Sequence, residues 1–312
     1  MDIKQLRSFI TISETKNITK AATLLNIVQP AVSRQIHLLE DELGVELFER
    51  SRHGMHLTNE GKILEVYARR VLKEIETAKI ELTSSDGTLR GTVNIGILAS
   101  LSELLSISLM KIIKQKYPYV NLKITVGYSG HLKEWLENGE IDLALIYGSV
   151  SSKFLDLQPL VKEQLWLIGS YHEELSQEES VELKQIANYD LILPYSPHRL
   201  RTLIEQGFHK AKYELKISAE VNDLNVQKQL VKEGLGLTIL PLVSIKNELE
   251  LKAFTASPID HPDFTREIAL ALPNTRHITK LVHTIAQEVI LSSKNAVQNK
   301  DWLGCEWIGK DD

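Results

Sequence analysis

Residues 21–50 read AATLLNIVQPAVSRQIHLLEDELGVELFER, and this stretch decides the fold of the N-terminal part of the chain. Within it, four apolar residues recur at helical spacing and predict one buried stripe: Val32, Ile36, Leu39 and Leu43. Pro30 suits the first turn of such a helix, because its missing N–H has no intrahelical acceptor there, and Gly44 suits the C-terminal stop. The pattern therefore predicts a helix from Gln29 to Leu43.

Two shorter helical patterns precede this helix. The first runs from Asp2 to Ser13, and the second follows Asn17, which is a typical N-cap residue. Residues 46–58 come after the third helix and predict a two-stranded wing. The first 58 residues thus predict a helix-turn-helix followed by a wing.

The third helix turns a short, polar and basic face away from its buried stripe. Between Thr15 and Leu39 the chain carries three cationic residues and no acidic one, although residues 1–58 balance seven Lys and Arg against seven Asp and Glu. A helix fits the major groove of B-DNA, where arginine pairs with guanine and glutamine with adenine, while wing residues meet phosphates or the minor groove. The candidate DNA contacts are Gln29, Pro30, Ala31, Ser33, Arg34, His37, Lys20, Arg50, Arg52 and His53. The alternative is a small helical domain whose polar face meets only water.

The run 21–50, followed by LTNEGK at 57–62, resembles the winged helix-turn-helix of LysR-type transcriptional regulators. That resemblance implies a DNA-binding domain. Val28 departs from the family pattern, which commonly has a serine capping the recognition helix at this position, and a lost cap typically costs about 1 kcal/mol. The departure puts in doubt a contact from residue 28 to the sugar-phosphate backbone of DNA. It does not affect the assignment of the domain.

From Asn59 to Leu82 the sequence predicts one long helix without proline. Its apolar residues recur at alternating spacings of four and three, which is typical of a coiled-coil seam: Leu64, Ala68, Val71, Ile75, Ala78 and Leu82. We expect this seam to pair with a second subunit, and the alternative is packing onto its own domain. The Ser- and Gly-containing stretch 84–88 then predicts a hinge.

After the hinge, predicted strands and helices alternate twice. Strands at 92–98, 122–126 and 141–147 alternate with helices at 103–116 and 131–138, and a second such unit spans 164–241. This order predicts parallel sheets with crossover helices in two α/β halves, with a further strand at 268–272 and a closing helix at 278–292. The order of elements resembles the effector-binding domain of LysR-type regulators, which is related in fold to periplasmic solute-binding proteins. Within that family, residues 127–148 and 191–205 look most like the nitrogen-assimilation (Nac/Cbl-like) branch.

Two α/β halves form a cleft, and ligands in such folds lie at the carboxyl ends of strands. Polar residues directly after predicted strands are therefore candidate effector contacts: Ser100, Ser102, Ser129, His131, Ser196, His198, Asn222 and Asp223. Ser100 and Glu103 have capping-box spacing. Because helix N-termini attract anions, we expect a small, carboxylate-type effector. The alternative for any one of these side chains is that it only caps a helix.

Other functions find little support in the sequence. Of the 312 residues only Cys305 is a cysteine, so no intramolecular disulfide is possible, and it is expected to be inert. The sequence contains no G-x-S-x-G, H-E-x-x-H or P-loop motif, so we expect neither a catalytic residue, nor a bound metal, nor a cofactor. It also shows neither a signal peptide nor a run of about 18 apolar residues, which predicts a cytoplasmic protein with no membrane partner. The net charge of −5 requires any DNA-binding charge to be local.

The predicted fold class is α/β overall, with an N-terminal winged helix-turn-helix (1–58), a linker helix and hinge (59–87), an effector domain (88–300) and a tail (301–312). Within the effector domain, subdomain I covers 91–161 and 268–300, and subdomain II covers 162–267. The expected function is a non-enzymatic transcriptional regulator that binds double-stranded DNA at dyad-symmetric sites and responds to a small molecule. The resemblance implies a dimer that pairs into a homotetramer, with RNA polymerase as a further candidate partner. The alternative is a ligand-binding or enzymatic α/β domain with a helical protein-interaction module.

Overall fold

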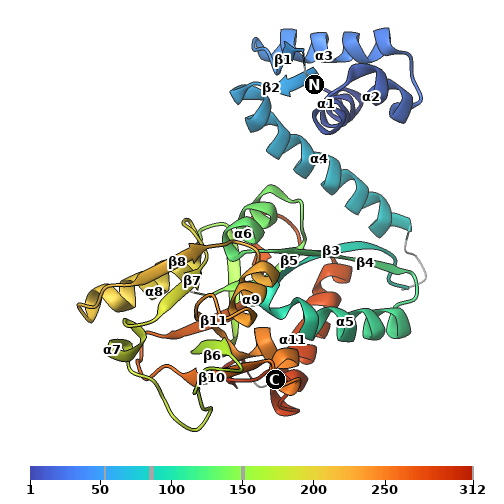
Figure 1. Cartoon of the computed structure of the whole chain (residues 1–312). Coiled ribbons are helices and arrows are strands. Elements are labelled where there is room, and N and C mark those ends of the chain that lie inside the picture. Colours follow the sequence, from blue (N-terminus) through green and yellow to red (C-terminus); the bar gives the residue numbers. More distant parts are fainter. Residues whose placement is uncertain (53, 84–87, 149–151, 311–312) are drawn as a thin grey trace. The chain divides into compact units, whose positions relative to one another are not determined.

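The computed structural model describes residues 1–52, 54–83, 88–148 and 152–310. By its internal contacts the chain divides into an N-terminal unit, Met1–Thr88 with Asn138–Glu140, and a C-terminal unit made of Leu89–Glu137 and Ile141–Asp312. Figure 1 shows the elements of both units. None of the helices in the described segments combines the length and apolarity that crossing a membrane requires.

The N-terminal unit begins with three helices, as the sequence predicts: α1 (Ile3–Thr15), α2 (Ile18–Leu25) and α3 (Gln29–Leu43). Asp2 caps α1 in a capping box, and the Asn17 side chain accepts a hydrogen bond from the Lys20 backbone N–H at the start of α2. Gly44 ends α3 with a left-handed φ of 69°. The helices α1 and α3 are joined by a hydrogen bond from the buried Ser8 hydroxyl to Gln35.

Three of the four predicted core residues of α3 are buried, at 0–5% exposed: Val32, Ile36 and Leu39. The prediction was wrong for Leu43, which is 40% exposed because α3 ends there, beyond the edge of the core. Val28 is the N-cap of α3 and makes no side-chain capping bond, so the expected departure from the family pattern has a structural counterpart.

The wing consists of β1 (Phe48–Ser51) and β2 (Gly54–Leu57), which pair antiparallel. The Met55 backbone N–H donates to the Lys16 carbonyl at the end of α1, at 2.9 Å. A Cβ on Gly54 would lie 2.4 Å from the same carbonyl oxygen, so the close approach of wing and helix requires glycine there.

The wing leads into one long helix, α4 (Asn59–Thr83). The Thr58 hydroxyl accepts from the Gly61 backbone N–H at 2.9 Å, which ties the wing to the first turn of α4. The predicted hinge at 84–88 lies outside the described residues except for Thr88.

The C-terminal unit is built on a sheet in the order β10-β6-β11-β5-β3-β4, to which β9 and β12 add by pairing with β6. Its strands are β3 (Gly91–Leu98), β4 (Val120–Gly127), β5 (Leu143–Tyr147), β6 (Leu155–Ser170), β9 (Thr238–Pro241), β10 (Phe254–Pro258), β11 (Thr265–Pro273) and β12 (Cys305–Trp307). A separate parallel pair is formed by β7 (Asp190–Leu193) and β8 (Lys216–Glu220). The α-helices are α5 (Ser102–Lys116), α6 (Ser129–Asn138), α7 (Leu183–Ile186), α8 (Arg199–Lys210), α9 (Leu224–Lys232), α10 (Lys246–Glu250) and α11 (Lys280–Gln298), and two short 3₁₀ segments are η1 (Ala99–Leu101) and η2 (Leu242–Ile245).

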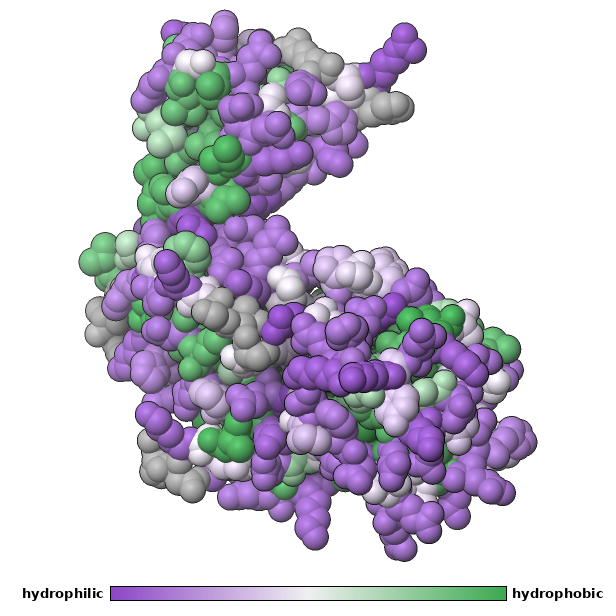
Figure 2. Space-filling view, turned by 90° about the vertical axis from the view of Figure 1, so that its left-hand side faces the viewer, coloured by the Kyte–Doolittle hydropathy of each residue, from purple (hydrophilic) through white to green (hydrophobic). Residues whose placement is uncertain are grey.

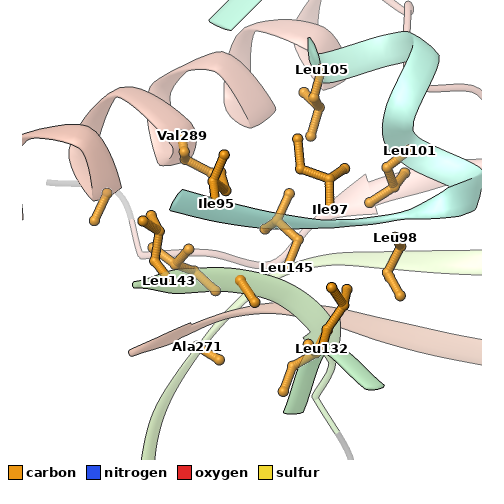
Figure 3. Packing of buried hydrophobic residues seen from close by; sticks show 14 of the residues in the cluster. Ile95, Ile97, Leu98, Leu101, Leu105, Leu132, Leu143, Leu145, Ala271 and Val289 are labelled. Atoms are coloured by element: carbon orange, nitrogen blue, oxygen red, sulfur yellow. The ribbon is translucent and has the colours of Figure 1, made fainter. Parts of the chain in front are cut away.

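Two separate apolar cores define two lobes of this unit. The core of lobe I lies between β3, β4 and β5 and the adjacent helices α5 and α11. Figure 3 shows Ile95 of β3 beside Val289 of α11, and Ile97 beneath Leu105 of α5. The core of lobe II packs α8 and α9 with the second half of β6.

The strand β6 crosses from lobe I to lobe II and changes partners on the way. Residues 155–164 pair with β11, whereas residues 165–170 pair with β9 and β10. The expected all-parallel sheets are therefore wrong in part, because β11 runs antiparallel to both β5 and β6. The predicted strand at 164–168 is the second half of β6 rather than the start of a new βαβ unit.

Candidate nucleic-acid interface and ligand cleft

The outward face of α3 carries the residues expected to contact DNA. Gln29, Pro30, Arg34 and His37 are exposed, and Ala31 and Ser33 are half-buried beside them. Their direction follows from the burial of Val32, Ile36 and Leu39 on the opposite side of the helix. The Gln29 side-chain amide donates to the Ser33 hydroxyl at 3.2 Å, so these two side chains already share one surface.

Acidic residues on α3 are confined to its second half. The Asp41 carboxylate lies 3.6 Å from the His37 imidazole, and Glu40 and Glu42 flank it. Residues 29–39 contain no acid. A DNA backbone is negatively charged, so the first two turns of α3 are the part of the helix suited to a groove.

Further candidate cations lie on α2 and the wing. Lys20 is exposed on the first turn of α2, and Arg52 is exposed in the turn between β1 and β2. The side chain of Arg50 and the whole of His53 lie outside what the structure describes.

Two adjoining pockets lie in the cleft between lobes I and II. The larger pocket, called the outer pocket here, has a volume of 270 Å³. The smaller one, at 40 Å³, is called the inner pocket because the buried side chains of Tyr147, Leu200 and Arg266 belong to its lining. The two pockets share four lining residues, and these make them one continuous site: Ala99, Ser100, Tyr128 and Leu224.

Six of the eight residues expected in the cleft line these pockets: Ser100, Ser102, Ser129, His198, Asn222 and Asp223. His131 and Ser196 are exposed and belong to neither lining. His131 instead stacks on Trp135, with ring centroids 5.7 Å apart. Ser196 precedes a cis proline in the loop before α8.

Helix capping is the role of some of these cleft residues, but it is not the role of Ser100. The Asp223 carboxylate caps α9 by accepting from the Val226 N–H, and the His198 imidazole caps α8. The expected capping box of Ser100 and Glu103 is wrong, because Ser100 lies within η1 and α5 starts without a side-chain cap. The Ser100 hydroxyl accepts a hydrogen bond from Arg266 at 2.9 Å instead.

The residues of the cleft that the sequence did not reveal include Arg266, Tyr128 and Lys228. Arg266 is 6% exposed and lies on β11, two residues before the predicted strand, so its charge was not counted as part of the sheet. A usable signal was a pair of opposite charges, Glu163 and Arg266, each close to an apolar run in its strand. Lys228 is buried and lies 2.6 Å from Glu248.

The electrostatics of the inner pocket favour an anion. The N-terminal ends of α5, α6, α8 and α9 reach the two pockets, through Ser102, Ser129, His198 and Asp223, and each presents partly positive N–H groups. Burial by itself would lower the pKa of Arg266, but the neighbouring Glu163 and Tyr147 raise the pKa above its usual range, so the guanidinium remains charged.

The pKa of His198, in the same pocket, is shifted in the opposite direction. Its burial, reinforced by the charge of Arg266 and by His131, lowers the pKa of His198 to about 4. The imidazole is therefore neutral near pH 7 and can accept the hydrogen bond that caps α8.

The apolar residues of α4 divide between two environments. Ala68 is 1% exposed and Leu64 is half-buried, both against the core of the N-terminal unit. By contrast, Val71 is 43% exposed and Leu82 is 84% exposed, and Ile75 and Ala78 continue the same face. Two residues outside the predicted seam join it: Ile63 and Tyr67. Figure 2 shows hydrophobic residues gathered on one flank of the N-terminal unit.

Comparison with known proteins identifies the class. Residues 3–62 match the family described as bacterial regulatory helix-turn-helix protein, lysR family, and residues 86–290 match the LysR substrate binding domain. The chain therefore belongs to the LysR family, and it is a DNA-binding transcriptional regulator with an effector-binding domain. The resemblance seen in the sequence is confirmed.

Individual relatives are similar along nearly their whole length. The chain is 26% identical over 304 residues to the nitrogen assimilation regulatory protein Nac of Klebsiella aerogenes, covering 96% of this chain and 98% of that protein. It is 31% identical to the transcriptional dual regulator GltC of Bacillus subtilis, with 93% and 97% covered. A crystal structure of full-length CbnR complexed with its target DNA has the same fold, with a TM-score of 0.68 at 20% identity, covering 94% of this chain and 100% of that one.

Nac and GltC are both named as regulators. Within the described residues, no three His, Cys, Asp or Glu side chains are grouped so that they could hold a metal ion.

The pKa of His198 predicts a pH dependence of stability. The unfolded chain binds a proton near pH 6.5 and the folded chain only near pH 4, so the free energy of unfolding falls as the pH drops through this interval. We expect a loss of about 2 kcal/mol between about pH 7 and about pH 5. His198→Asn keeps a capping acceptor without titrating and should lack this part of the loss in denaturant unfolding. Equal losses in both proteins would assign the effect to other groups.

Proposed function

We propose that the first two turns of α3 read DNA bases, and that Lys20 and the wing contact the phosphate backbone. The observation that carries this proposal is the acid-free face formed by the exposed Gln29 and Arg34 with the half-buried Ser33 between them. Arginine can donate two bonds to guanine, whereas the cations on α2 and at the wing tip suit sequence-independent phosphate contacts. His37, Pro30 and Ala31 complete the surface, and Arg50 and His53 are the further wing candidates.

We propose that α4 pairs with the same helix of a second subunit. The supporting observation is the line of exposed and half-buried apolar residues that continues the predicted seam from Val71 to Leu82, while Leu64 and Ala68 pack against the N-terminal core. Such a dimer presents two α3 helices to a dyad-symmetric site, and pairing of dimers gives the tetramer that the family resemblance implies. The regulator then acts in the compartment that holds the DNA, which is the cytoplasm of a bacterium. RNA polymerase is a candidate partner there.

We propose that the cleft binds a small effector bearing a carboxylate. Arg266 carries this proposal, since it is a buried guanidinium that lines the inner pocket and donates to Ser100. Ser129 and Asn222 lie in the same lining. An effector that fits one arrangement of the lobes better than another shifts the balance between them and so alters the regulator's state on DNA.

We propose the limits 1–58, 59–87 and 88–300 for the DNA-binding domain, the linker and the effector domain. The cores of the two lobes support subdomains at 91–161 with 268–300, and at 162–267. Residues 301–310 of the tail pair through β12 with β6 and extend lobe I.

The base-reading proposal predicts different effects for two arginines. Arg34→Ala should cost about 1 to 3 kcal/mol on a duplex that the unsubstituted protein selects from random sequences, and much less on a scrambled duplex. Arg52→Ala should weaken both complexes alike and reduce the salt slope by about one. Binding to both duplexes at several salt concentrations measures this. Equal losses for Arg34→Ala would make Arg34 a phosphate contact and leave base reading to Gln29, Ser33 or His37.

The pairing of α4 predicts that Val71→Asp dissociates the dimer, because a charge would be buried against the partner helix. Light scattering of the full chain should report half the mass. Lys62→Asp is the matched control, since Lys62 is exposed on another side of α4 and should leave the mass unchanged. An unchanged mass for Val71→Asp would show that this face of α4 does not pair.

The cleft proposal predicts that at least one of acetate, succinate, glutarate and citrate raises the thermal unfolding midpoint of the full chain. Ser100→Ala should weaken this binding by roughly 10- to 100-fold and leave DNA affinity without ligand nearly unchanged. Ser108→Ala is the control, since its hydroxyl donates to carbonyls of its own helix, α5. The proposal is rejected if none of the carboxylates stabilises the unsubstituted protein. An equal loss of DNA affinity in Ser100→Ala would make Ser100 structural.

A further inference from the structure

The segment 301–310 is tightly built into lobe I. Its strand β12 pairs with β6 and places Cys305 opposite Glu163. Trp302 is 2% exposed, and the Cys305 thiol donates to the Trp302 carbonyl at 3.0 Å. Burial, with Glu163 and Glu306 nearby, raises the pKa of Cys305 to about 12, so this thiol stays protonated and inert.

The side chain of Glu163 connects this segment to the interior. It is 0% exposed, and each of its two oxygens has a partner. Oε1 accepts from the indole N–H of Trp302 at 2.7 Å, and Oε2 accepts from Nε of Arg266. A buried carboxylate requires such partners, since an unpaired acceptor is costly.

The other edge of Arg266 continues the chain of hydrogen bonds into the cleft. One terminal nitrogen donates to the Tyr147 hydroxyl, and the other donates to the Ser100 hydroxyl at 2.9 Å. Arg266, Tyr147 and Ser100 all line the inner pocket. Consecutive hydrogen bonds therefore run from Trp302 through Glu163 and Arg266 to Ser100.

We propose that Trp302 is a positioning residue for the ligand cleft: by holding one oxygen of Glu163, it leaves the terminal nitrogens of Arg266 directed at Ser100 and the ligand. The reason is geometric. A carboxylate freed from the indole turns toward the arginine and bonds it at two points, because this arrangement satisfies both of its oxygens. Such a fork draws a terminal nitrogen of Arg266 away from the cleft.

The ligand part of this inference rests on the proposed carboxylate effector, but the coupling between Trp302 and the cleft does not. The coupling can be measured without a ligand in the full chain labelled with 5-fluorotryptophan, whose four tryptophans give separate ¹⁹F resonances. Ser100→Ala should shift the Trp302 resonance more than those of Trp166 and Trp307. An unmoved Trp302 resonance overturns the inference whether or not any ligand binds.

The second measurement compares two tryptophan variants with succinate as the probe. Trp302→Phe should weaken succinate binding roughly tenfold, as expected when a hydrogen bond to a charged group is lost. Trp307→Phe is the matched control, because the indole N–H of Trp307 is buried and has no hydrogen-bond partner among the described residues. DNA affinity without succinate should be unchanged in both variants, which distinguishes positioning from general destabilisation.

The outcomes separate the two proposals. If succinate does not bind the unsubstituted protein but the Trp302 resonance responds to Ser100→Ala, the coupling stands and succinate is excluded as a ligand of the cleft. If succinate binds and Trp302→Phe and Trp307→Phe weaken it equally, Trp302 is only a packing residue and the inference is wrong.

Discussion

The cleft depends on one constraint, which is that β6 belongs to two lobes at once. The strand pairs with β11 in its first half and with β9 and β10 in its second half. Both lobes are therefore joined by the hydrogen-bonded backbone of β6 rather than by a loose linker. The inner pocket lies beside β11, the antiparallel partner of β6, since Arg266 of β11 belongs to its lining. The buried ion pair of Glu163 and Arg266 sits on these two strands. Removing either partner leaves the other charge buried and unpaired, so the pair is far more sensitive to single substitutions than a surface ion pair.

The sequence predicts the N-terminal unit well because its signals are local. Apolar spacing, the Asn17 cap, Pro30 and Gly44 all act within one or two turns of the helix that they specify. Leu43 is the exception. It has the helical spacing of a core residue, but the core ends before it. Burial depends on where neighbouring elements stop, and spacing along one helix carries no information about that.

The sequence predicts less of the C-terminal unit because its decisive contacts are distant along the chain. Strand positions follow from apolar runs, but the antiparallel return of β11 brings together residues about a hundred positions apart, as with Glu163 and Arg266. The polar candidates for the cleft were found by their place after strands, and six of the eight line the pockets. Arg266 was missed because a charge near the start of a strand usually indicates a solvated end, whereas the antiparallel pairing of β11 with β6 places this residue beside Glu163 in the interior.

Because Trp302 orients Arg266, the DNA-binding domain and the ligand cleft are completed at different times while the chain is synthesised on the ribosome. The helix-turn-helix and α4 are complete in the first 83 residues, whereas the indole that orients the cleft arginine is added more than two hundred residues later. At synthesis rates of about 5 to 20 residues per second, this delay lasts roughly 10 to 45 s. Each nascent chain thus carries a finished DNA-reading surface for a time before its ligand cleft is in working order.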